Sequence, residues 1–204
     1  MTRVQALVGS SRDQVPHCCV DCVFWQRRDV VADPGAKADW ARDIEDEFGA
    51  WGRVIHDGAD ARGLVQYGPS RYFANAWALP AGPPDRRSVL ITCAYVCSDD
   101  PRGIVERLLL EALADVQARG LGLVEAFALE PSAPQDSSTC REHHHTLFDA
   151  EVLRRLGFHA VRSVGAVSLM RLQLDAAIPV EHQARIRRLL RHVRPSPVVR
   201  PEPV

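Results

Sequence analysis

A strand, a helix and a second strand in the middle of the chain limit the folds that this sequence can adopt. Residues 88–97 are apolar except at Ser88 and Thr92, which predicts a strand buried on both faces. Pro101 then begins a helix that runs to Arg119, and residues 123–129 form another buried strand. Consecutive strands joined through a helix favour a parallel pair. The sheet must therefore contain at least one parallel pair.

Weaker strand and helix signals on either side predict the remainder of the fold. Asp33 and Pro34 are typical of a helix start and Gly49 of a helix end, so we expect a helix between them. The further segments with strand patterns are 4–8, 52–56, 63–69, 158–164 and 166–174, and a second helix is expected at 145–156. The predicted class is α/β (α+β): a mixed, mostly antiparallel central sheet flanked by helices, with a C-terminal helix.

The chain has enough apolar residues for one large core. Of its 204 residues 46% are hydrophobic and 25% charged, values typical of globular domains. We expect one domain over 1–178, a basic helix over 179–194 and a proline-rich, flexible tail over 195–204. A formal charge of -1 argues against nucleic-acid binding, and apolar runs too short for a bilayer argue against a membrane. With no signal peptide read at the N-terminus, a cytoplasmic protein is expected.

The order of elements resembles the GCN5-related N-acetyltransferase (GNAT) family over residues 50–175. The segments that carry this resemblance are 89–96, 102–109, 118–120, 124–126 and 153–158. Residues 23–25 and 33–48 are similar to an actinobacterial-type subgroup. The family's pyrophosphate loop is degenerate here, since Gly103 is its one retained small residue and Val105 takes the last small position.

The resemblance implies acetyl-CoA as cofactor and an amine of a small molecule or protein as acceptor. Free N–H groups at a helix N-terminus bind phosphate, which suits the turn before the helix that begins at Pro101. By resemblance, the pantetheine arm pairs with the backbone of Ala94, Tyr95 and Val96. The residues expected around the pyrophosphate are Arg102, Gly103, Ile104 and Val105.

Three residues are candidates for the base that takes the proton of the attacking amine. Glu125 lies on the strand that would face the thioester, and His143 and His145 lie at the start of the expected closing helix. Imidazole is suited to this task at neutral pH. An ordinary strand carboxylate facing solvent is the alternative interpretation of Glu125.

Two clusters of cysteine and histidine suggest a metal. Cys18, Cys19 and Cys22 lie close together, and Cys140 and His143 form a second group far along the chain. Thiolates and imidazoles together suit tetrahedral zinc, although the spacing matches no standard zinc finger. Buried packing thiols and a solvated histidine loop are the alternative.

Two functions remain open on the sequence alone. The first is direct acetyl transfer from acetyl-CoA to an amine. The second is a catalytically degenerate GNAT-fold protein that binds zinc or a partner through its cysteine and histidine clusters. The oligomeric state stays open, with a homodimer as one option.

Overall fold

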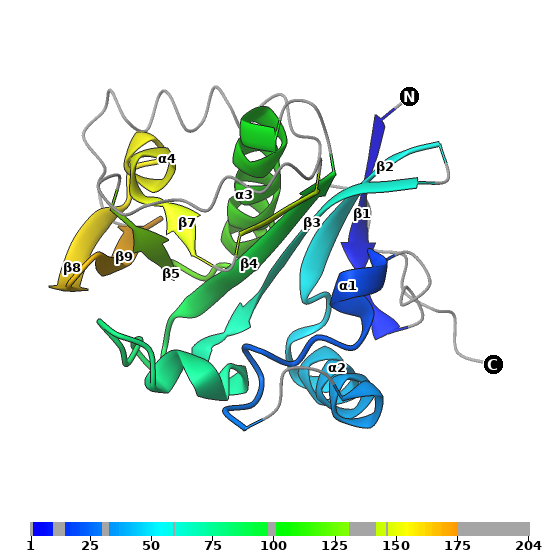
Figure 1. Ribbon diagram of the computed structural model, residues 1–204, viewed down its shortest axis with the longest axis horizontal. Helices are drawn as coiled ribbons and strands as arrows, with labels where there is room; N and C mark the ends of the chain where they lie inside the picture. The colour runs from blue at the N-terminus through cyan, green and yellow to red at the C-terminus, as the bar shows by residue number, and fades with distance from the viewer. Residues whose placement is uncertain are drawn as a thin grey trace.

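One mixed β-sheet with helices on both faces forms the body of the protein (Figure 1). The computed structural model describes residues 2–9, 15–29, 33–58, 60–97, 101–130, 142–145 and 147–174. The strands of this part are β1 (Thr2–Leu7), β2 (Gly52–Asp57), β3 (Asp60–Pro69), β4 (Val89–Cys97), β5 (Leu123–Leu129), β6 (Glu142–His145), β7 (Phe148–Asp149), β8 (His159–Val164) and β9 (Val167–Gln173). The α-helices are α1 (His17–Val20), α2 (Pro34–Phe48), α3 (Pro101–Ala118) and α4 (Ala150–Arg155).

The strand order confirms the predicted sheet. Neighbouring strands follow the order β1-β2-β3-β4-β5-β9-β8, while β6 pairs with β4 and β7 pairs with β5. Among the described strands, β4 is parallel to β5, β5 is parallel to β7, and the other pairs are antiparallel. The parallel pair is the one that the strand, helix and strand of residues 88–129 predicted.

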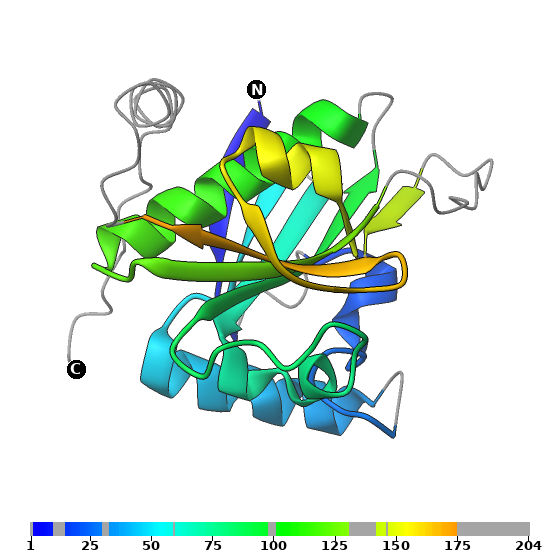
Figure 2. The same ribbon diagram turned by 90° about the vertical axis from the view of Figure 1, so that its left-hand side faces the viewer.

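Helices cover both faces of the sheet (Figure 2). On one face, residues of α3 and α4 join the apolar side chains of β4, β5 and β9 in one core cluster. On the other face, Trp40 and Ile44 of α2 and Cys19 of α1 join Trp51, Phe73 and Phe127 in a second cluster. The sheet is therefore the middle of three layers.

Local signals set the ends of α2 as expected. The Asp33 carboxylate accepts a hydrogen bond of 3.1 Å from the backbone N–H of Ala36, and Pro34 occupies the first turn. At the other end Gly49 has a φ of +84°, which glycine adopts without strain. The prediction of this helix is confirmed.

A buried polar network fixes α3 on the sheet. Asp115 of α3 is ion-paired with Arg53 of β2 and with Arg119, which directly follows α3. The hydroxyl of Tyr67 on β3 donates a hydrogen bond of 2.7 Å to the same carboxylate. Three donors to one largely buried carboxylate offset the cost of removing its charge from water. Gly63 of β3 permits a close approach, since a Cβ there would lie 2.9 Å from Ile104 Cγ2.

The prediction of a helix over 145–156 is wrong in its first half. Residues 142–145 form β6 and residues 148–149 form β7, and α4 begins only at Ala150. Asp149 caps α4, because its carboxylate accepts a hydrogen bond of 2.8 Å from the N–H of Glu151. The expected helix at 179–194 and the tail at 195–204 lie outside the described residues. Within the described part, no helix is long and apolar enough to cross a membrane.

Candidate functional site

The candidate site begins where β4 and β5 separate. Parallel pairing between these strands covers Val89–Ile91 of β4 and Val124–Ala126 of β5, and it goes no further. Beyond Ile91, β4 continues for six residues to Cys97, and beyond Ala126, β5 continues for three residues to Leu129. The two strands therefore expose facing backbone edges that need other partners.

Short strands of the segment 142–149 supply partners for both edges. Residues 142–145 of β6 pair antiparallel with β4, so that His145 lies opposite Ala94, His144 opposite Tyr95 and His143 opposite Val96. On the other separated strand, β5, residues Ala128 and Leu129 pair with Phe148 and Asp149 of β7. The structure thus brings the backbone of His143 and His145 beside the expected pantetheine edge of β4. It also shows that this edge accepts an extended partner.

The helix expected to bind pyrophosphate starts beside this opening. α3 begins at Pro101, four residues after β4 ends. In its first turn Gly103 is exposed, Ile104 is half-buried, and Val105 is buried in the core with 5% of its surface exposed. The Val105 side chain therefore packs into the core. The backbone of Arg102 lies in α3, but its side chain lies outside the described part.

These features fit an extended cofactor with an anionic end. The edge of β4 from Ala94 to Val96 offers backbone pairing of the kind that β6 now takes. The N-terminus of an 18-residue helix at the end of that strand offers N–H groups and partial positive charge. A pantetheine arm and β6 need the same hydrogen-bonding groups of β4, so the two cannot occupy this edge together.

The carboxylate of Glu125 is held by two other parts of the chain. Its side chain is fully buried, which also excludes the solvent-facing alternative. One carboxylate oxygen accepts hydrogen bonds of 3.0 and 2.7 Å from the Nε and Nη2 of Arg171, which lies directly opposite on β9. The other accepts a 2.7 Å hydrogen bond from the backbone N–H of Asp85. Both oxygens are engaged, so the carboxylate ties β9 and the loop at Asp85 to β5.

The zinc site expected from the cysteine clusters is not supported. Within the described residues, no group of three or more histidine, cysteine or acidic side chains could hold a metal ion. Cys18 is exposed, Cys19 is buried and Cys22 is half-buried, while the backbone of His143 lies on β6 and Cys140 lies outside the described residues. Burial raises the pKa of Cys19 well above its ordinary value. The Cys19 side chain packs in the cluster of Trp40 and Trp51, which agrees with the packing alternative.

A buried lysine is the polar group that the sequence analysis missed. Lys37 of α2 is 6% exposed, and its ammonium donates a 2.7 Å hydrogen bond to the side-chain carbonyl of Gln66. It lies 4.4 Å from the ring centre of Trp40 and 5.2 Å from that of Trp51. Burial lowers the pKa of Lys37 to about 8, so the amine is mainly protonated at pH 7. The sequence did contain a sign of this burial. Lys37 lies three residues before Trp40 and seven before Ile44, a spacing that places all three on one helix face.

Comparison with known proteins identifies the fold. No protein-family model and no curated protein matches the sequence. The N-acetyltransferase of Staphylococcus aureus Mu50 matches with a TM-score of 0.51 and 11% identity, over 86% of this chain and 98% of that one. The ribosomal-protein-S5-alanine acetyltransferase of Vibrio fischeri matches with a TM-score of 0.52 and 14% identity, over 87% and 96%.

A third solved structure was determined with a cofactor. It is a candidate acetyltransferase from Salmonella typhimurium with its cofactor acetyl-CoA, and it matches with a TM-score of 0.52 and 18% identity, over 87% of this chain and 97% of that one. At such identities the likeness establishes the arrangement of elements. The mixed sheet, the separated parallel pair β4 and β5 and the helix after β4 agree with it. The chain therefore has the fold of the GCN5-related N-acetyltransferase family.

Proposed function

We propose that this protein is an N-acetyltransferase that transfers the acetyl group of acetyl-CoA directly to an amine. The observation that carries the proposal is the separation of β4 and β5 after Ile91 and Ala126, directly before a long helix. This places an open backbone edge and a helix N-terminus at one end of the sheet. Both suit a cofactor with an extended arm and a pyrophosphate.

Residues of this chain would hold the cofactor and the amine in reacting positions. The backbone of Ala94, Tyr95 and Val96 would pair with the pantetheine arm, and the first turn of α3 around Gly103 would bind the pyrophosphate. When bound, acetyl-CoA would supply an activated thioester. The amine nitrogen would form a bond to the acetyl carbon while the carbon–sulfur bond breaks, and the acceptor would be a small-molecule or protein amine.

The segment that carries β6 has two roles in this proposal. Because β6 and the pantetheine arm need the same edge of β4, cofactor binding displaces β6 from that edge. The same segment carries His143 and His145, which we propose as the candidate bases for the proton that the amine loses. Glu125 is not included, because both oxygens of its carboxylate are already engaged by Arg171 and Asp85.

A transfer assay with separated products tests this function. Purified protein is incubated with acetyl-CoA and a set of primary amines, and free CoA and acetylated amine are measured by chromatography and mass spectrometry. A thiol-reactive dye is unsuitable, since the chain itself has six cysteines. Enzyme-dependent formation of both products in equal amounts is expected. Failure to bind acetyl-CoA, or hydrolysis without any acetylated amine, would overturn the proposal.

Histidine variants test the base separately. Loss of a general base lowers a rate by about 100-fold or more, so His143→Gln or His145→Gln should slow transfer by that factor without weakening acetyl-CoA binding. His159→Gln is the matched control, because His159 is an exposed histidine on β8. Equal activity of all three variants would exclude the two histidines as bases.

A further inference from the structure

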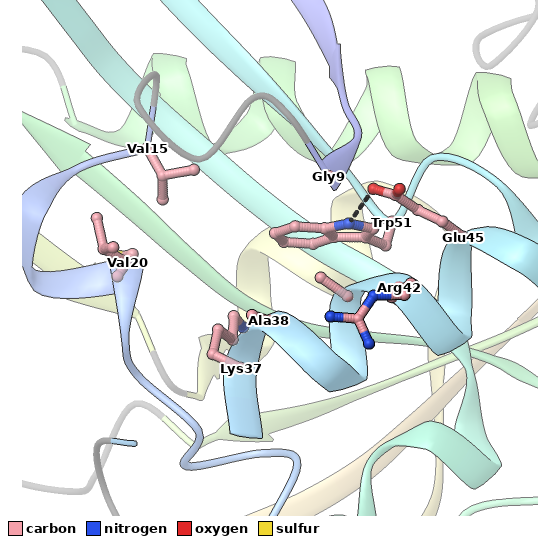
Figure 3. Close-up of a pocket in the computed structure, with 10 residues that line it drawn as sticks. Gly9, Val15, Val20, Lys37, Ala38, Arg42, Glu45 and Trp51 are labelled. Carbon is pink, nitrogen blue, oxygen red and sulfur yellow. Dashed lines mark hydrogen bonds between the residues drawn. The ribbon is translucent and has the colours of Figure 1, made fainter. Parts of the chain in front are cut away.

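Two adjoining cavities lie on the face of the sheet covered by α1 and α2. The outer one has a volume of about 330 Å³, and Figure 3 shows eight of its lining residues labelled, among them Val15, Val20, Lys37 and Trp51. The inner one has a volume of about 20 Å³ and shares Val15, Cys19, Lys37 and Trp51 with the first. No residue of β5 or α3 lines either cavity. The inner cavity reaches β4 at Cys93, next to Ala94, but the described walls include none of the residues proposed to hold the cofactor.

The inner cavity is lined by an excess of hydrogen-bond donors. The indole N–H of Trp25 and the side-chain amide nitrogen of Gln26 are buried and have no hydrogen-bond partner in the described protein. Trp25 is 2% exposed and Gln26 is 8% exposed, and both residues line this cavity together with the ammonium-bearing Lys37. Buried polar groups are normally paired. Three donor-bearing residues line one small space, which suits an acceptor with more than one oxygen.

The charge of Lys37 points to an acceptor that is an anion. Among the described residues, Lys37 has no carboxylate in ion-pair distance, and its pKa is affected only by burial and by nearby cysteines. Burial raises the pKa of Cys93 to about 11 and that of Cys19 further, so these two thiols stay neutral at pH 7. They therefore supply no counter-charge. An ammonium in an apolar setting is strongly stabilised by a paired anion.

Glu45 does not fill this role. It lines the outer cavity and accepts a hydrogen bond of 3.0 Å from the indole N–H of Trp51, as the dashed line in Figure 3 marks. It also accepts a hydrogen bond from the backbone of Gly9. Its carboxylate is thus committed to Trp51 and to Gly9, which follows β1, so Glu45 is not an ion-pair partner of Lys37.

The outer cavity fits the apolar body of a small ligand. Its walls include the side chains of Val15, Val20, Ala38 and Ala41 and the ring of Trp51, and its mouth has the exposed residues Gly9 and Arg42. A mainly apolar cavity with a few convergent polar groups at one end is typical of small-molecule sites. The volume lies at the lower end of the range for such sites, which limits the ligand to a small molecule.

We propose that the two cavities bind a small monocarboxylic acid with an apolar body. Its carboxylate accepts hydrogen bonds from Lys37, Trp25 and Gln26 in the inner cavity. Its apolar part lies in the outer cavity along Val15, Val20 and Trp51. The site requires neither acetyl-CoA nor acetyl transfer, so its test is independent of the test of the proposed enzyme activity.

The single lysine of this chain permits a direct test. Protein labelled with ¹³C at the lysine ε-carbon gives one side-chain signal from the chain, because Lys37 is its one lysine. Hexanoate is titrated in the absence of acetyl-CoA, and hexanamide serves as the neutral probe of the same length. Hexanoate should move the Lys37 signal in a saturable way and bind at least about ten-fold more tightly than hexanamide. Equal affinities, no saturable binding of hexanoate, or binding that leaves the signal unmoved would overturn the proposal.

Variants locate the charge that matters. Lys37→Met keeps the apolar stem and removes the ammonium, so hexanoate binding measured by calorimetry should weaken about ten-fold while hexanamide binding stays the same. Arg107→Met is the matched control, because Arg107 is an exposed cation on α3, on the other face of the sheet. It should leave both affinities unchanged. A loss of hexanoate binding in Arg107→Met equal to that in Lys37→Met would show general charge attraction and overturn the assignment.

Discussion

Replacing Arg171 by methionine should destabilise the protein strongly, because it leaves the buried carboxylate of Glu125 without its cation. Glu125 is fully buried and keeps the N–H of Asp85 as its remaining donor. Removing one partner of a buried ion pair costs about 3–5 kcal/mol. The Arg171 side chain is 28% exposed, so water can partly replace it. We therefore expect a loss near the lower limit, about 3 kcal/mol in the free energy of unfolding.

Urea unfolding followed by circular dichroism measures this loss. Arg154→Met is the matched control, since the pair of Arg154 and Glu130 is substantially exposed and such pairs contribute about 0–1 kcal/mol. Glu125→Gln keeps the shape of the side chain and should leave the rate of acetyl transfer unchanged in the folded fraction. If Arg171→Met costs no more than Arg154→Met, the structural role of Glu125 is wrong. A large loss of transfer in fully folded Glu125→Gln would return Glu125 to the catalytic candidates.

Three further perturbations test separate parts of the structure. Asp33→Ala removes the cap of α2 and should lower the free energy of unfolding in urea by about 1 kcal/mol. Asp33→Asn keeps a capping oxygen and should retain most of this stability, so equal losses in the two variants would exclude the cap. Burial lowers the pKa of Lys37 from 10.5 to about 8, so the folded state binds fewer protons than the unfolded state between these values. The unfolding free energy of the wild type relative to Lys37→Met should therefore rise over this pH range, by up to about 3 kcal/mol, and a flat difference would contradict the buried charge. His144→Pro weakens β6, since a proline inside a short strand cannot donate a backbone hydrogen bond and restricts φ. If the substitution costs β6 about 1 kcal/mol, the size of one hydrogen bond, acetyl-CoA should bind about five-fold more tightly in calorimetry. Val161→Pro is the control, because Val161 lies at the irregularity of β8, and it should leave the affinity unchanged. Unchanged affinity in His144→Pro would mean that β6 does not compete with the cofactor.

The sequence predicted the sheet well because its strands and helix ends have strong local signals. The apolar segment 88–97, the helix after Pro101 and the cap at Asp33 each act over a few residues. Their positions agree with β4, α3 and α2. The resemblance to the family also pointed to the backbone of Ala94–Val96, which lies where β4 no longer pairs with β5.

The remaining features depend on contacts between distant residues. β6 has the composition Glu-His-His-His, which carries no strand pattern, and it forms a strand because the edge of β4 lacks another partner. The ion pair of Glu125 joins residues 46 positions apart. Lys37 was overlooked because lysine is rarely buried. Of its neighbours, Trp40 lies on the same helix, whereas Gln66 and Trp51 are brought to it by the fold.

Hydrogen–deuterium exchange with and without acetyl-CoA tests the central claim most directly. The claim is that the cofactor arm takes the edge of β4 now paired with β6. We predict that acetyl-CoA speeds exchange in peptides covering residues 142–145, keeps Ala94–Val96 protected and slows exchange in the first turn of α3. Acetyl-CoA binding that leaves β6 and the start of α3 unchanged would contradict the claim, as would the absence of any binding.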